Sequence, residues 1–159
     1  MTMTLIETIT VGSGGATSIE FTGIADDAKD LVLLLSLRNS VDSPSATLAF
    51  NTGGSYTRKR LLGNGSEESS DSATVDLQSN TSVSTANTFS NSSLYVSNYA
   101  ILGAKSYLVD SVNENNATLA NQAIIAGSWT GTAAITSLEL TPSSGYFVQH
   151  SSASLYLIS

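Results

Sequence analysis

Alternation of apolar and polar residues runs through most of this chain and restricts it to β structure. Ile19 and Phe21, for example, lie on either side of the charged Glu20. Successive side chains of a strand point to opposite faces, so a period of two predicts strands with one buried face and one open face. Ten stretches carry this signal: residues 3–11, 17–22, 31–38, 46–51, 73–78, 93–97, 106–112, 121–128, 134–140 and 153–158.

Two of these stretches contain runs that are apolar at every position, Leu31–Leu35 and Ala123–Ala126. Each run is either a central strand or a strand covered on both sides by a subunit contact. Turn residues separate the stretches, and no segment holds a 3.6-residue period over three turns. The sequence therefore predicts one domain over residues 1–159, an all-β, antiparallel, jelly-roll-like sandwich of about eight to ten short strands with almost no helix.

Hydroxyl and amide groups, rather than charges, form the polar part of this sequence. It has 28 serines and 18 threonines, but six basic and thirteen acidic residues, for a net charge of −7. This balance argues against nucleic acid and anionic membranes as partners, because both attract clustered Lys and Arg. There is no cysteine, which excludes disulfides and thiolate chemistry. The N-terminus has no basic region before an apolar core, so we expect no signal peptide.

Residues able to carry catalysis or bind a metal are few. The single histidine, His150, has no Gly-x-Ser-x-Gly motif in the sequence to pair with. Acidic residues cluster in the segments 26–30 and 110–114, but neither has the spacing of a calcium-binding loop. We therefore expect no enzyme activity, no cofactor and no metal, and we interpret both clusters as polar turns.

Half of the basic residues stand together at Arg58, Lys59 and Arg60, next to Tyr56. On a strand, Arg58 and Arg60 would point to one face and Lys59 to the other. One interpretation is a solvated edge strand that its charges protect from aggregation. The other is a contact, made by these four residues, with an acidic partner subunit.

Three further segments have an expected place in the fold. The polar segments Gly63–Ser72 and Ser79–Ser93 are expected to be exposed loops, because they are rich in Ser, Asn and acidic residues. Trp129 follows an apolar run, so burial in the core or at an interface is expected for its ring.

Most of the chain resembles a family of small virion proteins of tailed bacteriophages that infect cyanobacteria and marine bacteria. The residues that carry the resemblance are IETITVGSGGATSIEFTGI (Ile6–Ile24), DLVLLLSLR (Asp30–Arg38), YTRKRLLGNGS (Tyr56–Ser66), ANTFSNSSLYVSNY (Ala86–Tyr99), DSVNENNAT (Asp110–Thr118) and GSWTGTAAITSLELTPSSGYFVQHSSASLYLI (Gly127–Ile158). The chain departs from the family pattern at Leu62 and Leu157, where members usually have an aromatic residue and a glycine.

The resemblance implies a structural protein of the virion, made in the host cytoplasm. Its expected role is that of a capsid decoration or cement protein, which binds the outside of the assembled major-capsid lattice and stabilises it. A homotrimer would match the local three-fold positions of such a lattice. The alternative is a tail-fibre or receptor-binding module, in which loops such as Ser79–Ser93 would bind host glycans.

Overall fold

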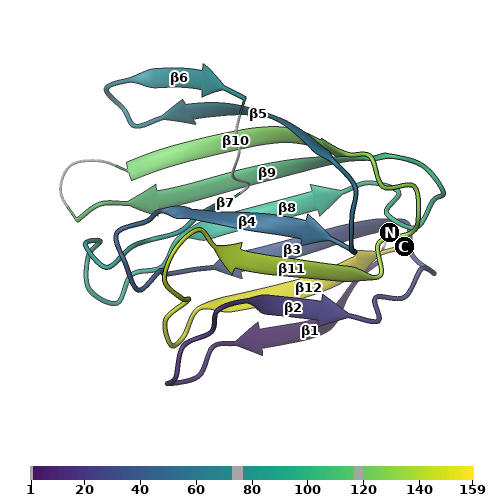
Figure 1. Ribbon diagram of the computed structural model, residues 1–159, viewed down its shortest axis with the longest axis horizontal. Coiled ribbons are helices and arrows are strands. Elements are labelled where there is room, and N and C mark those ends of the chain that lie inside the picture. Colours follow the sequence, from purple (N-terminus) through teal and green to yellow (C-terminus); the bar gives the residue numbers. More distant parts are fainter. Residues whose placement is uncertain (1, 73–76, 117–119) are drawn as a thin grey trace.

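Two antiparallel β-sheets pack face to face in the computed structural model, which describes residues 2–72, 77–116 and 120–159 (Figure 1). The larger sheet has eight strands in the order β1 (Met3–Thr10), β12 (Ser152–Ile158), β3 (Asp30–Ser36), β8 (Asn91–Val96), β9 (Lys105–Glu114), β10 (Ala120–Trp129), β5 (Tyr56–Gly63) and β6 (Glu68–Asp71). The smaller sheet has the order β2 (Ile19–Thr22), β11 (Ser137–Pro142), β4 (Ser45–Phe50) and β7 (Leu77–Gln78). The predicted all-β sandwich is therefore confirmed, and the described residues contain no helix.

The alternating sequence pattern becomes an alternating burial pattern along the strands. In β8 and β9 every second side chain is buried against the smaller sheet and the intervening ones are exposed. All ten predicted stretches contain a strand, although residues 73–76 of the stretch 73–78 lie outside the described part of the chain. The twelve strands exceed the expected eight to ten because β5 and β6 were not among those stretches.

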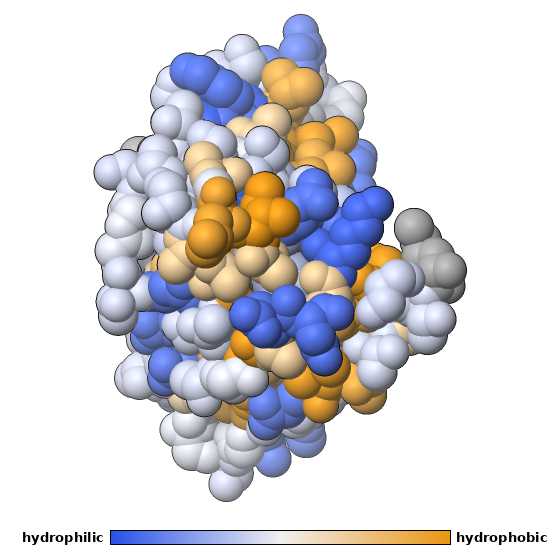
Figure 2. Space-filling view, turned by 90° about the vertical axis from the view of Figure 1, so that its right-hand side faces the viewer, coloured by the Kyte–Doolittle hydropathy of each residue, from blue (hydrophilic) through white to orange (hydrophobic). Residues whose placement is uncertain are grey.

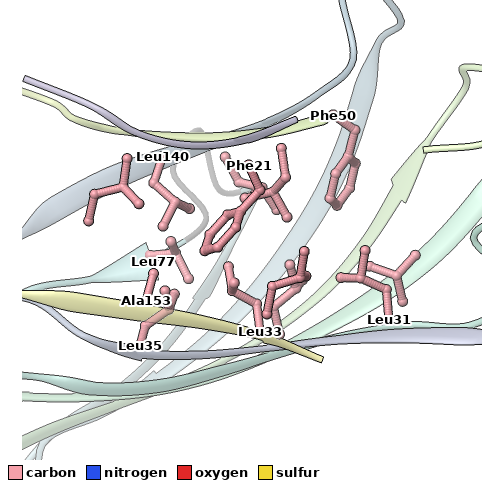
Figure 3. Close-up of a cluster of buried hydrophobic side chains, with 14 of the residues drawn as sticks. Phe21, Leu31, Leu33, Leu35, Phe50, Leu77, Leu140 and Ala153 are labelled. Carbon is pink, nitrogen blue, oxygen red and sulfur yellow. The ribbon is translucent and has the colours of Figure 1, made fainter. Parts of the chain in front are cut away.

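The hydrophobic core fills the space between the sheets. Figure 3 shows Phe21, Phe50 and Leu140 of the smaller sheet facing Leu31 and Leu33 of the larger one, and all five side chains are buried. Full burial of an aliphatic or aromatic side chain of this size contributes roughly 1.5–3 kcal/mol. The same core explains why the inner residues of the two fully apolar runs are buried.

A buried lysine joins two loops at one end of the sandwich. Lys105 begins β9 and is only 1% exposed. Its ammonium group donates hydrogen bonds to the carbonyl oxygens of Ile101, Gly103 and Ala133, which belong to the β8–β9 and β10–β11 loops. Burial lowers the pKa of Lys105, and the three carbonyl groups offset part of the cost of removing its charge from water.

The outside of this end is partly apolar. The β8–β9 loop exposes Leu102, whose side chain is 89% accessible, and Ile101 beside it. Figure 2 faces this end and shows apolar residues gathered near its centre, with hydrophilic residues around them. Isolated exposed apolar residues are common on protein surfaces, so this group alone indicates no particular partner.

Candidate interaction surface

The basic run lies on β5, which is not an edge strand. β5 pairs with β10 on one side and with β6 on the other, so the edge-strand interpretation is wrong and β6 forms the edge. β6 falls within Gly63–Ser72, which was expected to be a loop. The chain reverses there because Asn64 Oδ1 accepts hydrogen bonds from the amides of Ser66 and Glu67, while Gly65 adopts a φ of 84°.

The four residues expected to contact a partner are divided between the two faces of β5. Tyr56, Arg58 and Arg60 lie on the inner side, where the Arg58 guanidinium stacks 4.4 Å from the centre of the Tyr56 ring and donates to the Tyr107 hydroxyl at 3.1 Å. Lys59 lies on the outer side, with its ammonium group 2.5 Å from Ser72 Oγ. The structure thus places the four residues on one strand but not on one face.

Arg60 forms an ion pair across the β5–β6 hairpin. Its guanidinium lies 2.5 Å from the Asp71 carboxylate, on the residue directly opposite in the strand register. Such a partly exposed pair contributes at most about 1 kcal/mol. At the start of β5 the Tyr56 ring packs against Phe50 of the smaller sheet, and its hydroxyl accepts a hydrogen bond from the Phe50 amide. Beyond Tyr56, Figure 1 shows β5 and β6 extending past the smaller sheet, which does not cover the inner side of the hairpin there.

The outer face of the larger sheet, meaning the face that points away from the smaller sheet, carries a row of mostly apolar side chains. Strand register places seven residues side by side in it: Leu5, Tyr156, Val32, Tyr95, Leu108, Ala126 and Lys59. The neighbouring row is Thr8, Ser154, Leu34, Ser93, Asp110, Ile124, Leu61 and Ser70. Lys59 and Asp110 are the charged residues in these two rows.

Several apolar side chains of the outer face are open to solvent. Leu61 is 62% exposed, Leu108 is 49% exposed and Ile124 is 42% exposed. Two adjoining hollows of about 710 and 550 Å³ meet around Leu61, Ser70 and Ile124, and Lys59 and Ala126 line the smaller one. The sequence singled out Lys59 and, within the apolar run Ala123–Ala126, Ile124. It did not single out Leu61 or Leu108, which only the strand register places beside them.

The two fully apolar runs of the sequence each contribute exposed side chains to this outer face. In Leu31–Leu35 the inner residues are buried, whereas Leu34 is exposed on the outer face. In Ala123–Ala126 the outward residues are Ile124 and Ala126, and both are exposed. Both runs are in interior strands, β3 and β10, yet their outward side chains are covered by no other layer among the described residues.

The segment Ser79–Ser93 was expected to be an exposed loop, but much of it is buried. Arg38 donates from its guanidinium to the carbonyl oxygens of Ser84, Thr85 and Thr88 at 2.7–3.2 Å. The side chains of Ser84 and Ser90 are buried too. The polar composition that suggested exposure instead satisfies hydrogen bonds inside the fold.

Glu114 binds the same segment from the other side. Its carboxylate accepts hydrogen bonds from the amide and hydroxyl of Thr85, the hydroxyl of Thr88, the side-chain amide of Asn80 and the amide of Asn116. The donors of Thr88, Asn116 and Thr85, that of Thr88 foremost, lower the pKa of Glu114 although burial opposes them. The acidic segment 110–114 therefore includes a carboxylate that organises a neighbouring loop.

The remaining candidates for chemistry are held in structural roles or lie apart. His150 is exposed in the turn before β12, with a φ of 73°. Asp30 is buried and accepts hydrogen bonds from the Tyr95 hydroxyl at 2.5 Å and the Asn98 amide at 2.9 Å. In the part of the chain that the structure describes, no three acidic or histidine side chains are placed to share a metal ion. The same part contains no helix that could span a membrane.

The outer face and the β5–β6 hairpin are thus the surfaces whose chemistry suggests contact with another molecule. The outer face offers exposed apolar side chains, and the hairpin offers cationic ones. A scan against protein-family models, a search of curated proteins and a search of solved structures each found no match to this chain.

Proposed function

We propose that this protein is a structural component of a bacteriophage virion, a decoration or cement protein that binds the outside of the assembled major-capsid lattice. The observation that carries an assembly role is the outer face, where apolar side chains of neighbouring strands are exposed together. Monomeric soluble proteins rarely leave a large apolar patch uncovered. The resemblance of the sequence to small virion proteins supports the phage capsid as the place of assembly.

The mechanism follows from binding equilibria. A protein that binds the assembled lattice but not its free subunits stabilises the lattice by mass action. A surface of hydroxyls and amides with few charges lets many copies lie close together without strong repulsion. For the contact itself we propose the inner side of β5, with Arg58 and Arg60 beside Tyr56, because the β5–β6 hairpin extends beyond the smaller sheet (Figure 1). Lys59 lies on the opposite face and is not part of this contact.

The tail-fibre alternative has less support. In that role the segment Ser79–Ser93 would present its polar groups to a host glycan. Many of these groups instead bind Arg38 and Glu114 within the protein. The residues left exposed there lie in several short pieces: Ser82 and Val83, Thr85–Asn87, Asn91 and Ser93.

Binding of the purified protein to capsid shells that lack it tests the proposal. The wild-type protein is expected to sediment with the shells and to raise the temperature at which they disassemble. Changing both Arg58→Ser and Arg60→Ser is expected to weaken binding about tenfold or more, since cations at such a contact are desolvated against acidic groups. Wild-type protein that stays in the supernatant at all concentrations would refute the cement role.

Two matched variants separate the contact from the fold. Asp71→Asn removes the internal partner of Arg60 but keeps both arginines, so it should bind shells like the wild type. Lys29→Ser removes an exposed cation elsewhere and should also bind normally. If the double arginine variant binds as well as these two, the β5 contact is wrong while the cement role stands.

A further inference from the structure

We infer that a second copy of this chain packs against the outer face in a two-fold symmetric pair, with the contact centred on strand β10 and its neighbours β9 and β5. The inference comes from the chemistry of this face and does not depend on the virion role. A two-fold interface uses the same patch on both subunits, so that patch must be complementary to itself. Three observations indicate that this one is.

The first observation is the distribution of charge. The chain has a net charge of −7, so two copies repel each other over most of their surfaces. Within the two central rows of the outer face, the charged side chains are one cation, Lys59, and one anion, Asp110. Glu68, opposite Gly63 in the strand register, lies beside these rows and lines the larger hollow. Two copies can therefore approach through the two central rows, but not through the part of the face around Glu68, without the repulsion that other surfaces would cause.

The second observation is the position of these two charges. Lys59 lies on β5 in the row of Leu108 and Ala126, whereas Asp110 lies on β9 in the row of Ile124. Strand β10 runs midway between them. A two-fold axis in the plane of the face exchanges the two positions if it crosses β10 between Ile124 and Ala126 and is perpendicular to the line from Lys59 to Asp110. Lys59 of each copy then faces Asp110 of the other, around a centre of apolar side chains.

The third observation is the size and shape of the face. The five strands centred on β10, namely β8, β9, β10, β5 and β6, lie about 4.8 Å apart and are four to ten residues long. At about 3.3 Å per residue they give an area on the order of 600 Å². That approaches the roughly 800 Å² that each partner buries in an interface of standard size. The two hollows around Leu61 and Ile124 are depressions into which apolar side chains of the other copy can pack.

A charge-exchange series measured by sedimentation equilibrium tests the pairing. The wild-type chain is expected to reach the mass of two subunits as its concentration is raised to ~100 µM, since interfaces of this size have micromolar or tighter dissociation constants. Lys59→Glu alone or Asp110→Lys alone places like charges opposite each other twice in every pair. Each single variant should raise the dissociation constant about tenfold or more.

Rescue is the decisive result. The double variant Lys59→Glu with Asp110→Lys exchanges the two charges and should restore pairing to near the wild-type level. Two controls with the same change in net charge, Lys29→Glu and Glu139→Lys, alter exposed residues away from the outer face and should leave the mass unchanged. Circular dichroism of each variant verifies that the β fold is retained.

Four outcomes would overturn the inference: a wild-type monomer throughout the concentration range, pairing that neither single variant weakens, single variants that the double variant does not rescue, or a mass of three subunits. The last would agree with the homotrimer that the resemblance implies and would move the subunit contact to another surface. Replacing Leu61 and Ile124 with serine provides a second test, because removal of these exposed side chains should also weaken pairing while the inner core remains intact.

Discussion

Replacing Lys105 with methionine is expected to lower the free energy of unfolding by about 1–3 kcal/mol, because three partly buried carbonyl oxygens would lose their charged donor. Methionine has a similar length and volume, so the substitution leaves little cavity and removes mainly the hydrogen bonds. The ammonium group also lies 5.4 Å from the Trp129 ring, and this attraction would disappear too.

Urea unfolding at neutral pH measures this effect, with Lys29→Met as the matched control. Lys29 is exposed, so its replacement should change the free energy of unfolding by no more than about 0.5 kcal/mol. If Lys105→Met were as stable as the control, the lysine would not be what joins the two loops at this end of the sandwich.

Glu114→Gln is expected to loosen the segment Ser79–Ser93 and to remove a pH dependence of stability. The folded pKa of Glu114 is lowered by its donors, so the carboxylate stabilises the fold fully above its unfolded pKa of about 4.3. As the pH falls through the lower folded pKa, protonation removes this contribution. The difference in stability between wild type and variant should therefore be largest near neutral pH and disappear in acid.

Hydrogen exchange locates the same effect within the chain. The amides of Thr85 and Asn116 donate to Glu114, so they should exchange about tenfold faster or more in the variant at neutral pH. Glu139→Gln, on an exposed position of β11, serves as the control and should change neither amide. Equal exchange in both variants would mean that the carboxylate does not hold the segment.

The sandwich could be predicted from the sequence because a strand with one buried face has apolar and polar residues that alternate with a period of two. The hairpin β5–β6 could not, since no alternation of apolar and polar residues runs along it. Arg58 and Arg60 lie inward where the smaller sheet does not cover them, and β6 consists of Glu, Ser and Asp. β5 forms through backbone pairing with β10, and β6 forms through pairing with β5. Such pairing leaves no hydrophobic pattern in the sequence.

The candidate interaction surface could be predicted from the sequence only in part, for a related reason. The sequence indicates that Leu34 and Ile124 belong to apolar runs, but not that they share one face with Leu61 and Leu108. That fact depends on the register of five strands that are distant in sequence. The polar segment Ser79–Ser93 was placed wrongly because composition alone does not distinguish hydroxyls bonded to water from hydroxyls bonded within the protein.

The number of copies of this protein per virion, measured by quantitative mass spectrometry of purified particles against the major capsid protein, tests the central claim most directly. A cement protein is expected to be present at a ratio near one copy per major-capsid subunit, because it must occupy equivalent positions over the whole shell. A handful of copies per virion would contradict the capsid role and place the protein at the tail.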